Sequence, residues 1–379
     1  MATTPPPQIK VYIPLPLTVA LDLNVDPTNW RWAHCLTIPL EKLAALQLSR
    51  RPYKWIRYAI GAVVGAEGVL STSSDSHNAV EEDTVTLPES ADLYYHISDE
   101  EKRRIFLVDT HARHTNVTSS VQTNLRIDFR EDVARRDGGR CILIGYPGYV
   151  CDAVHLLPHS KGDEYIETYT KRRSRDPDEE DIIREIDNTR NGLFLNKSAH
   201  PALGRDLAFL VTPNFAMNTT DIDPTASPTA KRFTSHVFDS NIPPAFFKGS
   251  FQISDTSESP PAILFDAVYA SAVLHHFGAP TLENDISAAW KDALCPTMNV
   301  KTKQDQDQER DKRHEVRREA RQRFDAFDVI LALPYILTSR EEVQAVLTEA
   351  KDNAEAAEQS CGREKVDAWM KQIPAYSLH

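Results

Sequence analysis

The chain has 379 residues, 41% of them hydrophobic and 26% charged, which is ordinary for a globular protein and allows two or three domains. Its formal net charge of −12 argues against a molecule that binds polyanions over its whole surface, so any nucleic-acid site must be local. Five scattered cysteines argue against a disulfide framework, and no stretch resembles a signal peptide or is apolar enough to cross a bilayer. We therefore expect an intracellular protein, nuclear or cytoplasmic, that is not secreted and has no membrane partner.

Residues 1–108 are predicted to form a β-rich N-terminal region. Alternating or β-branched stretches indicate strands, and Pro14 and Pro16 confine the first of them to a sheet edge. A short amphipathic stretch after the second strand indicates a turn of helix. The predicted strands are 10–17, 30–38, 55–64 and 92–96, and the predicted helical turns are 40–48 and 98–104.

Residues 109–230 are predicted to form the central domain. It begins with a helix at 125–137, which leads into a strand at 142–144. Turn chemistry rich in glycine and proline follows at 145–148, and an extended apolar pattern resumes at 150–157. The two strands are expected to pair as a hairpin.

Six cations of the central domain are candidates for contacts with a nucleic-acid backbone. Four of them lie close together in a polar excursion after the second strand, which favours phosphate binding, but acidic neighbours make a solvated loop an equal alternative. The other two lie on the first helix among acidic residues, where an exposed ion-paired face explains them as well. The candidates are Arg135, Arg136, Lys171, Arg172, Arg173 and Arg175. A helix is expected directly after the cluster, at 177–186.

Residues 231–379 are predicted to form a mainly helical C-terminal region. Its most apolar run, 263–277, indicates a buried helix that ends at Gly278. His275 and His276 stand at the end of this helix and could be metal ligands. The favourable interaction of a protonated histidine with a helix C-terminus explains them without a metal.

The rest of the C-terminal region is strongly charged. Residues 301–323 are predicted to form an exposed helix or a linker, and 340–370 a helix with one apolar face. Such a face packs on the body of the protein or on another chain. The C-terminal helices are therefore candidates for binding a protein partner.

Three side chains that can grip or polarise a hydrated cation stand at the ends of elements in the central domain: His155, Asn191 and His200. The motifs around them are Arg-Cys at 140–141, His-x-x-Pro at 155–158, Asn-Gly-Leu-x-Leu at 191–195 and His-x5-Asp at 200–206. This order and spacing resemble the His-Asn-His (HNH) endonucleases, most closely the HNH-domain proteins of fungi. The resemblance implies a β-hairpin and a helix around one metal ion. The expected fold class is therefore α+β with a central ββα-metal module.

The same resemblance implies a metal-dependent endonuclease that hydrolyses phosphodiester bonds of DNA, with RNA a less expected partner. His155 is the expected general base and His200 a metal ligand. Asn191 either fixes the imidazole of His155 or binds the metal through its carbonyl oxygen, and Asp206 helps to hold the metal. The expected cofactor is one divalent ion, either Mg²⁺ or a transition metal such as Mn²⁺, Ni²⁺ or Zn²⁺.

One position departs from the family pattern. Many relatives carry Asp or His as a metal ligand directly before the base, where this chain has Val154. The metal would then depend on His200 with help from Asp206, Asp152 or His159. The alternative to the enzyme is therefore a catalytically degenerate HNH-fold protein that acts as a scaffold for nucleic acid or protein.

The cysteines determine whether a second, structural metal site is expected. Many HNH relatives bind a structural zinc ion through two Cys-x-x-Cys pairs, and this chain contains no such pair. Cys141 and Cys151 could face each other across the hairpin, and we expect them to be small core residues. No structural zinc ribbon is predicted.

Overall fold

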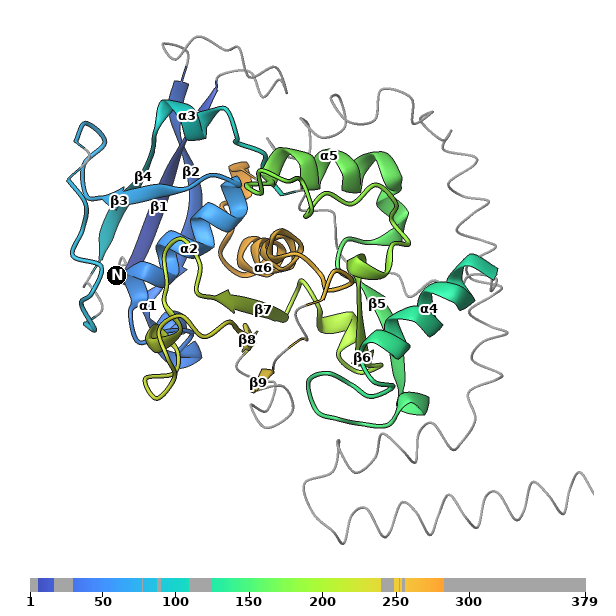
Figure 1. The fold of residues 1–379 in the computed structure, drawn as a ribbon. Coiled ribbons are helices and arrows are strands. Elements are labelled where there is room, and N and C mark those ends of the chain that lie inside the picture. The colour runs from blue at the N-terminus through green and yellow to red at the C-terminus, as the bar shows by residue number, and fades with distance from the viewer. Residues whose placement is uncertain are drawn as a thin grey trace, which may run out of the picture. The chain divides into compact units, whose positions relative to one another are not determined.

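The computed structural model describes residues 6–16, 30–76, 78–86, 90–108, 124–239, 249–251, 253 and 256–282, with the backbone alone for 124–128 (Figure 1). All of them belong to one compact unit, Met1–Pro296. The predicted charged segment 301–323, the helix at 340–370 and the proposed partner-binding face lie outside the described residues. In the described part, no helix combines the length and the apolar character needed to span a membrane.

A four-stranded sheet forms the N-terminal part of this unit. Its strands, in spatial order, are β2 (Trp30–Pro39), β1 (Gln8–Pro16), β4 (Ala91–Ile97) and β3 (Gly68–Ser71). The strand β1 pairs with β2 along its whole length but with β4 only over 9–12. Pro14 and Pro16 therefore lie where β1 has a single neighbour, as expected of prolines, although the first half of β1 is a central strand.

The stretch at 55–64, predicted to be a strand, is instead part of the helix α2 (Pro52–Val64). Pro52 occupies its first turn, where a missing N–H costs no hydrogen bond, and Gly65 ends it with φ +80°. The helix is buried on most sides and packs against α6 (Ala262–Phe277). A continuous apolar run does not distinguish a buried strand from a buried helix, so the prediction was wrong. The helical turns α1 (Leu40–Leu46) and α3 (Asp99–Lys102) are confirmed.

The centre of the unit is an antiparallel hairpin of β5 (Cys151–His155) and β6 (Gly192–Asn196), in which His155 lies opposite Gly192. The helix α4 (Asn124–Arg136) packs on this hairpin (Figure 1). A Cβ on Gly192 would lie 2.7 Å from side-chain carbons of both Phe129 and Val133. Glycine therefore permits the close approach of α4 to the strand.

Two predictions next to the hairpin were wrong. Residues 142–144 form a turn, so the expected hairpin of 142–144 with 150–157 does not form, and β5 pairs with β6 instead. Residues 177–186 form turns and irregular backbone in place of a helix. The helix of the excursion between β5 and β6 is α5 (Asp163–Arg173), whose acidic first turn and basic last turn suit the helix dipole. The N–H groups of Ile183 and Ile186 donate to side chains of α5. These bonds hold residues 177–186 against α5, and the segment does not form a helix of its own. Three short 3₁₀ turns also flank the strands: η2 (Gly148–Val150), η3 (His159–Lys161) and η4 (Thr189–Asn191).

After β6 the chain forms the 3₁₀ turn η5 (His200–Ala202) and then a three-stranded sheet. The order in that sheet is β7 (Leu207–Thr212), β8 (Arg232–Val237) and β9 (Ser250–Phe251), with the 3₁₀ turn η6 (Thr219–Asp221) between β7 and β8. The predicted helix at 263–277 is confirmed as α6, which packs on β7. The described structure is mixed α+β, as predicted. The helix that packs on the hairpin is α4, which precedes it, whereas the resemblance implied a strand–strand–helix order.

Candidate functional site

His155 stands at the end of β5, where the strand leaves the hairpin. Its neighbour Val154 is fully buried, and because side chains alternate along a strand, His155 faces the other side. There its ring stacks on Phe129 of α4, with ring centres 4.1 Å apart and an interplanar angle of 7°. The side chain keeps 16% of its surface exposed. The imidazole is therefore held firmly while part of it remains in reach of solvent.

Asp187 fixes the same ring by a hydrogen bond. His155 Nε2 lies 2.9 Å from Asp187 Oδ1, and His159 Nε2 lies 3.4 Å from Asp187 Oδ2. Because a carboxylate only accepts, His155 carries a proton on Nε2 and donates it. The bond from His155 lowers the pKa of Asp187 below its ordinary value, against the opposing effect of partial burial. Sequence analysis missed Asp187, because a carboxylate in a long excursion has no spacing rule relative to the histidine that it contacts.

Asn191 ends η4, directly before β6, and its fully buried side chain makes three hydrogen bonds to the backbone. Its Nδ2 donates to the carbonyl oxygens of Leu157 and Ile186 at 3.0 and 2.8 Å, and its Oδ1 accepts from Leu157 N at 2.9 Å. These bonds hold the chain just after His155 against the chain just before β6. The arrangement differs from both roles expected of Asn191, a bond to His155 and a metal ligand, because its amide faces the interior.

His200 begins η5 and is partly buried. Burial lowers its pKa below the ordinary value, the charge of Asp152 opposes this change, and the charge of His155 adds to it. The two histidines of the motif and Asp152 of β5 therefore lie close enough to act on one another electrostatically. His155 ends β5, whereas His200 follows the end of β6, and Asp152 near the start of β5 also pairs with Arg130 at 3.5 Å.

One comparison with known proteins gives a match, and it covers the segment that contains these residues. Residues 141–211 match the family model of the HNH endonuclease. The matched segment, called the HNH segment below, contains His155, Asn191, His200 and Asp206. The match confirms the resemblance at the level of this nuclease family. It does not extend to the fungal subgroup. No curated protein and no solved structure matches the chain.

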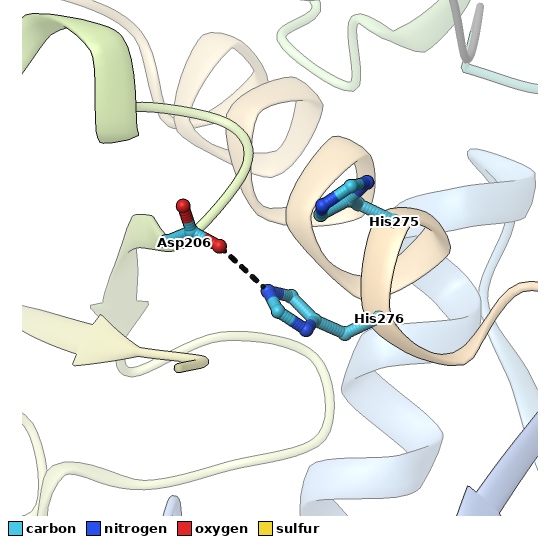
Figure 2. Close-up of side chains that lie close together, drawn as sticks. All are labelled: Asp206, His275 and His276. Atoms are coloured by element: carbon cyan, nitrogen blue, oxygen red, sulfur yellow. Dashed lines mark hydrogen bonds and ion pairs between the residues drawn. The ribbon is translucent and has the colours of Figure 1, made fainter. Parts of the chain in front are cut away.

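Asp206 is the last residue of the motifs in the HNH segment. Its side chain contacts other residues in place of His200. Its Oδ1 is 3.1 Å from His276 Nε2, and its Oδ2 is 2.6 Å from Arg205 Nε. In the described part of the chain, Asp206, His275 and His276 form the group whose possible ligand atoms all lie within 4.8 Å of one another (Figure 2). Sequence analysis considered the two histidines and preferred the helix C-terminus as their explanation.

Three of the six candidate phosphate contacts are engaged by other groups of the protein, two of them at buried or partly buried positions and Arg175 at an exposed one. Arg136 bonds Asp137 and the carbonyl oxygens of Thr189 and Gly192. Arg173 is buried and donates to three backbone carbonyl oxygens, those of Ala62, Val63 and Phe106. Arg175 pairs with Glu67 and Glu101. The cluster of four cations is therefore not one surface, because Arg173 is buried at the end of α5 and Arg175, beyond the helix, is paired with two glutamates.

The other three candidates are exposed or partly exposed. The side chain of Arg135 is 73% exposed and pairs with Asp132, Lys171 is exposed, and Arg172 is partly exposed. Arg135 also lines a cavity of about 790 Å³ beside the last turn of α4. Its lining includes two arginines and three carboxylates, those of Asp132, Asp137 and Glu258, so its charge does not favour an anion.

Cys141 and Cys151 are buried free thiols, as expected of small core residues. The Sγ of Cys141 accepts from Asn196 N at 3.3 Å, which ties the turn before the hairpin to the end of β6. Burial, with Cys141 nearby, raises the pKa of Cys151 to about 11. The Cys151 thiol therefore stays protonated at neutral pH, and both cysteine side chains serve packing.

Proposed function

We propose that the protein is a metal-dependent endonuclease that hydrolyses phosphodiester bonds of DNA, with His155 as the general base. The observation that carries this proposal is the fixed imidazole of His155. It is stacked on Phe129, bonded to Asp187 and partly exposed, within a segment that matches the HNH endonuclease family. A positioned imidazole is the usual group for taking a proton from water near neutral pH.

Asp187 gives the base its orientation and its charge balance. With the ring proton of His155 directed to Asp187, the basic lone pair of the imidazole is on Nδ1. When His155 takes a proton from water, the ring becomes positively charged. The carboxylate of Asp187, at 2.9 Å, stabilises that charge. Asp187 is thus proposed as a positioning residue, acting through His155 and not on the substrate.

His200 and Asp152 offer an imidazole and a carboxylate, two kinds of ligand for a divalent ion. His200 has a lowered pKa and is therefore neutral at pH 7, the form that binds a metal, and the charge of Asp152 acts on it. We propose that these two side chains hold the ion, with η5 in the place of the family's helix. A bound divalent ion would stabilise the charge that develops on the phosphate and on the leaving oxygen. In this arrangement Asn191 positions the loop after His155, and Asp206 belongs to another group.

The substrate contacts that remain available are few. Arg135, Lys171 and Arg172 are the candidates for the flanking phosphates, since Arg136, Arg173 and Arg175 are engaged by the protein itself. Few cations and a net charge of −12 suggest weak, salt-sensitive binding of DNA.

The second candidate function is a degenerate HNH scaffold that has kept the fold without catalysis. Val154 favours it, because this residue before the base is fully buried and offers no ligand, which leaves two protein ligands for the ion. Such a scaffold would bind nucleic acid or a protein partner without cutting DNA.

Cleavage of supercoiled plasmid distinguishes the two functions. The full chain is incubated with plasmid and Mg²⁺, Mn²⁺, Ni²⁺ or Zn²⁺, and in parallel with EDTA. The endonuclease nicks the plasmid with at least one ion and not with EDTA. A folded protein that leaves the plasmid intact with every ion would be the scaffold, and single-stranded RNA in the same assay tests the preference for DNA.

A further inference from the structure

The cluster of Asp206, His275 and His276, called the α6 cluster below, lies outside the proposed catalytic residues. Asp206 comes from the turn before β7, and the two histidines from the last turn of α6 (Figure 2). One possible ligand atom from each residue lies within 4.8 Å of the others. Figure 2 shows the carboxylate of Asp206 facing the two imidazoles.

The backbone and a neighbouring ring hold these side chains in place. The N–H of Asp206 bonds Ala202 O and its carbonyl accepts from Phe238 N, both at 2.8 Å. The ring of Phe238 stacks on His276, with centres 5.7 Å apart and an interplanar angle of 15°. Asp206 is buried, whereas His275 is exposed. The cluster is thus anchored on the inside and reachable from solvent.

Its donors are those of a transition-metal site. Two imidazoles and one carboxylate bind Zn²⁺, Ni²⁺ and related ions, whereas Mg²⁺ and Ca²⁺ prefer oxygen ligands alone. The 3.1 Å between His276 Nε2 and Asp206 Oδ1 is close to the separation of about 3.3 Å between two ligand atoms of a tetrahedral zinc ion. We propose that Asp206, His275 and His276 form a binding site for a divalent transition-metal ion, in addition to the site at the hairpin.

Lys42 of α1 opposes the binding of a cation. Its Nζ lies 2.8 Å from His276 Nδ1, and a charged ammonium only donates, so the ring proton of His276 is on Nε2 and points to Asp206. An ion that binds Nε2 must displace this proton and tolerate the charge of Lys42 nearby. Arg205, bonded to Oδ2 of Asp206, adds a second positive charge. The site therefore alternates between an internal Lys42–His276–Asp206 chain of hydrogen bonds and a metal-bound form.

Metal binding would join the turn before β7 to the end of α6. An ion that binds the folded chain and not the unfolded one stabilises the fold by mass action. Because these elements pack on each other without the ion, we expect a metal that adds stability to an already folded protein.

The test compares four full-length proteins by calorimetric titration with Zn²⁺ and by thermal unfolding with and without Zn²⁺. One is a parent protein, and the other three carry a further substitution. These substitutions are His275→Ala, Lys42→Gln and the control Lys171→Gln, which removes a lysine charge from α5. The parent carries His200→Ala, so that the hairpin site does not contribute, and each variant is made in that background. His275 is exposed, and circular dichroism checks that its variant folds.

The parent should bind one Zn²⁺ at the α6 cluster and unfold at a higher temperature with Zn²⁺. Loss of a direct ligand in His275→Ala should weaken binding by more than about a hundredfold, and remove the thermal shift. Lys42→Gln should tighten binding by roughly tenfold, because a like charge is removed and the proton of His276 can move to Nδ1. Lys171→Gln should bind as the parent does. Equal affinity in parent, His275→Ala and Lys42→Gln, or no Zn²⁺ binding by the parent, would overturn the proposal.

Discussion

The carboxylate of Asp187 and the imidazole of His155 are joined by a hydrogen bond of 2.9 Å between Oδ1 and Nε2. The two residues are 32 positions apart: His155 ends β5, and Asp187 lies near the end of the long excursion that leads to β6. This bond determines which nitrogen of the proposed base carries a proton. It is the contact on which the catalytic proposal depends most.

Asp187→Asn should lower the rate of DNA cleavage by about a hundredfold or more while leaving the KM for DNA nearly unchanged. An amide can donate to Nε2 and favour the other tautomer of His155, in which the basic lone pair is misdirected. Asp187→Glu, which keeps the charge, should lose less. Steady-state kinetics on a labelled duplex measure both constants. A change in KM alone would assign Asp187 to substrate binding.

The pH dependence of stability should report the same bond. The pKa of Asp187 is lowered in the folded protein, mainly by the bond from His155, so its charged form is favoured by folding. Its contribution to the free energy of unfolding is therefore full above the pKa of the unfolded chain. It is lost as the pH falls from about 5 through the lowered pKa. Urea unfolding across this range should show wild type and Asp187→Asn converging as the pH decreases. A difference that grows on acidification would have the wrong sign.

Two substitutions of Asn191 test whether this residue positions the loop after His155 or binds the metal. Asn191→Ala leaves two buried carbonyl oxygens and one N–H without their partner and should lower the free energy of unfolding by about 3 kcal/mol or more. Asn191→Asp should also destabilise, because a carboxylate cannot donate to Leu157 and Ile186. If Asn191 were a ligand, the aspartate would instead keep or strengthen metal binding. Chemical denaturation and metal titration of both variants decide.

Gly192→Ala should disturb the packing of α4 on the hairpin. The added methyl group would lie 2.7 Å from carbons of Phe129 and Val133, which overfills the contact and should cost about 1–3 kcal/mol of stability. Because Phe129 also stacks on His155, the variant should cut DNA more slowly even where it remains folded. Gly249→Ala is a suitable control, since a Cβ there meets nothing within 4 Å. Equal stability of the two variants would contradict the close approach of α4.

The cations of α5 should separate into structural and DNA-contacting residues. Arg173→Gln removes donors to three backbone carbonyl oxygens and should destabilise the protein without a specific effect on DNA binding. Lys171→Gln, at an exposed position, should leave stability unchanged and reduce the salt dependence of DNA binding by about 0.9 in log–log slope. Fluorescence anisotropy at several salt concentrations measures this slope. An unchanged slope would remove Lys171 from the DNA-contacting residues.

Parts of this structure follow from local sequence signals. The apolar run that ends at Gly278 predicts α6, and the extended apolar pattern at 150–157 predicts β5, because each depends on nearby residues. The helix α2 was missed because its largely apolar stretch at 55–64 also fits a buried strand. Residues 177–186 were predicted as a helix, but their N–H groups bond side chains of α5, which no local pattern reports.

The residues of the site also divide into those that a local sequence signal predicts and those that it does not. His155, Asn191 and His200 are found by motif, since their spacing is set within one short segment of chain. The contacts that give them roles come from elsewhere: Phe129 from α4, and Asp187 from the long excursion. The α6 cluster joins Asp206 to His276, 70 positions away, and to its neighbour His275. Such contacts depend on how the elements pack, and one sequence contains no direct record of that packing.

The rate of plasmid nicking by His155→Ala, beside wild type and His34→Gln, tests the central claim most directly. His34 lies on β2 and bonds its own strand, so this control removes a histidine of the N-terminal sheet. We predict that His155→Ala remains folded and nicks plasmid about a hundredfold to ten-thousandfold more slowly with the active ion, while His34→Gln keeps the wild-type rate. Nicking by folded His155→Ala at the wild-type rate would contradict the assignment of His155 as the base.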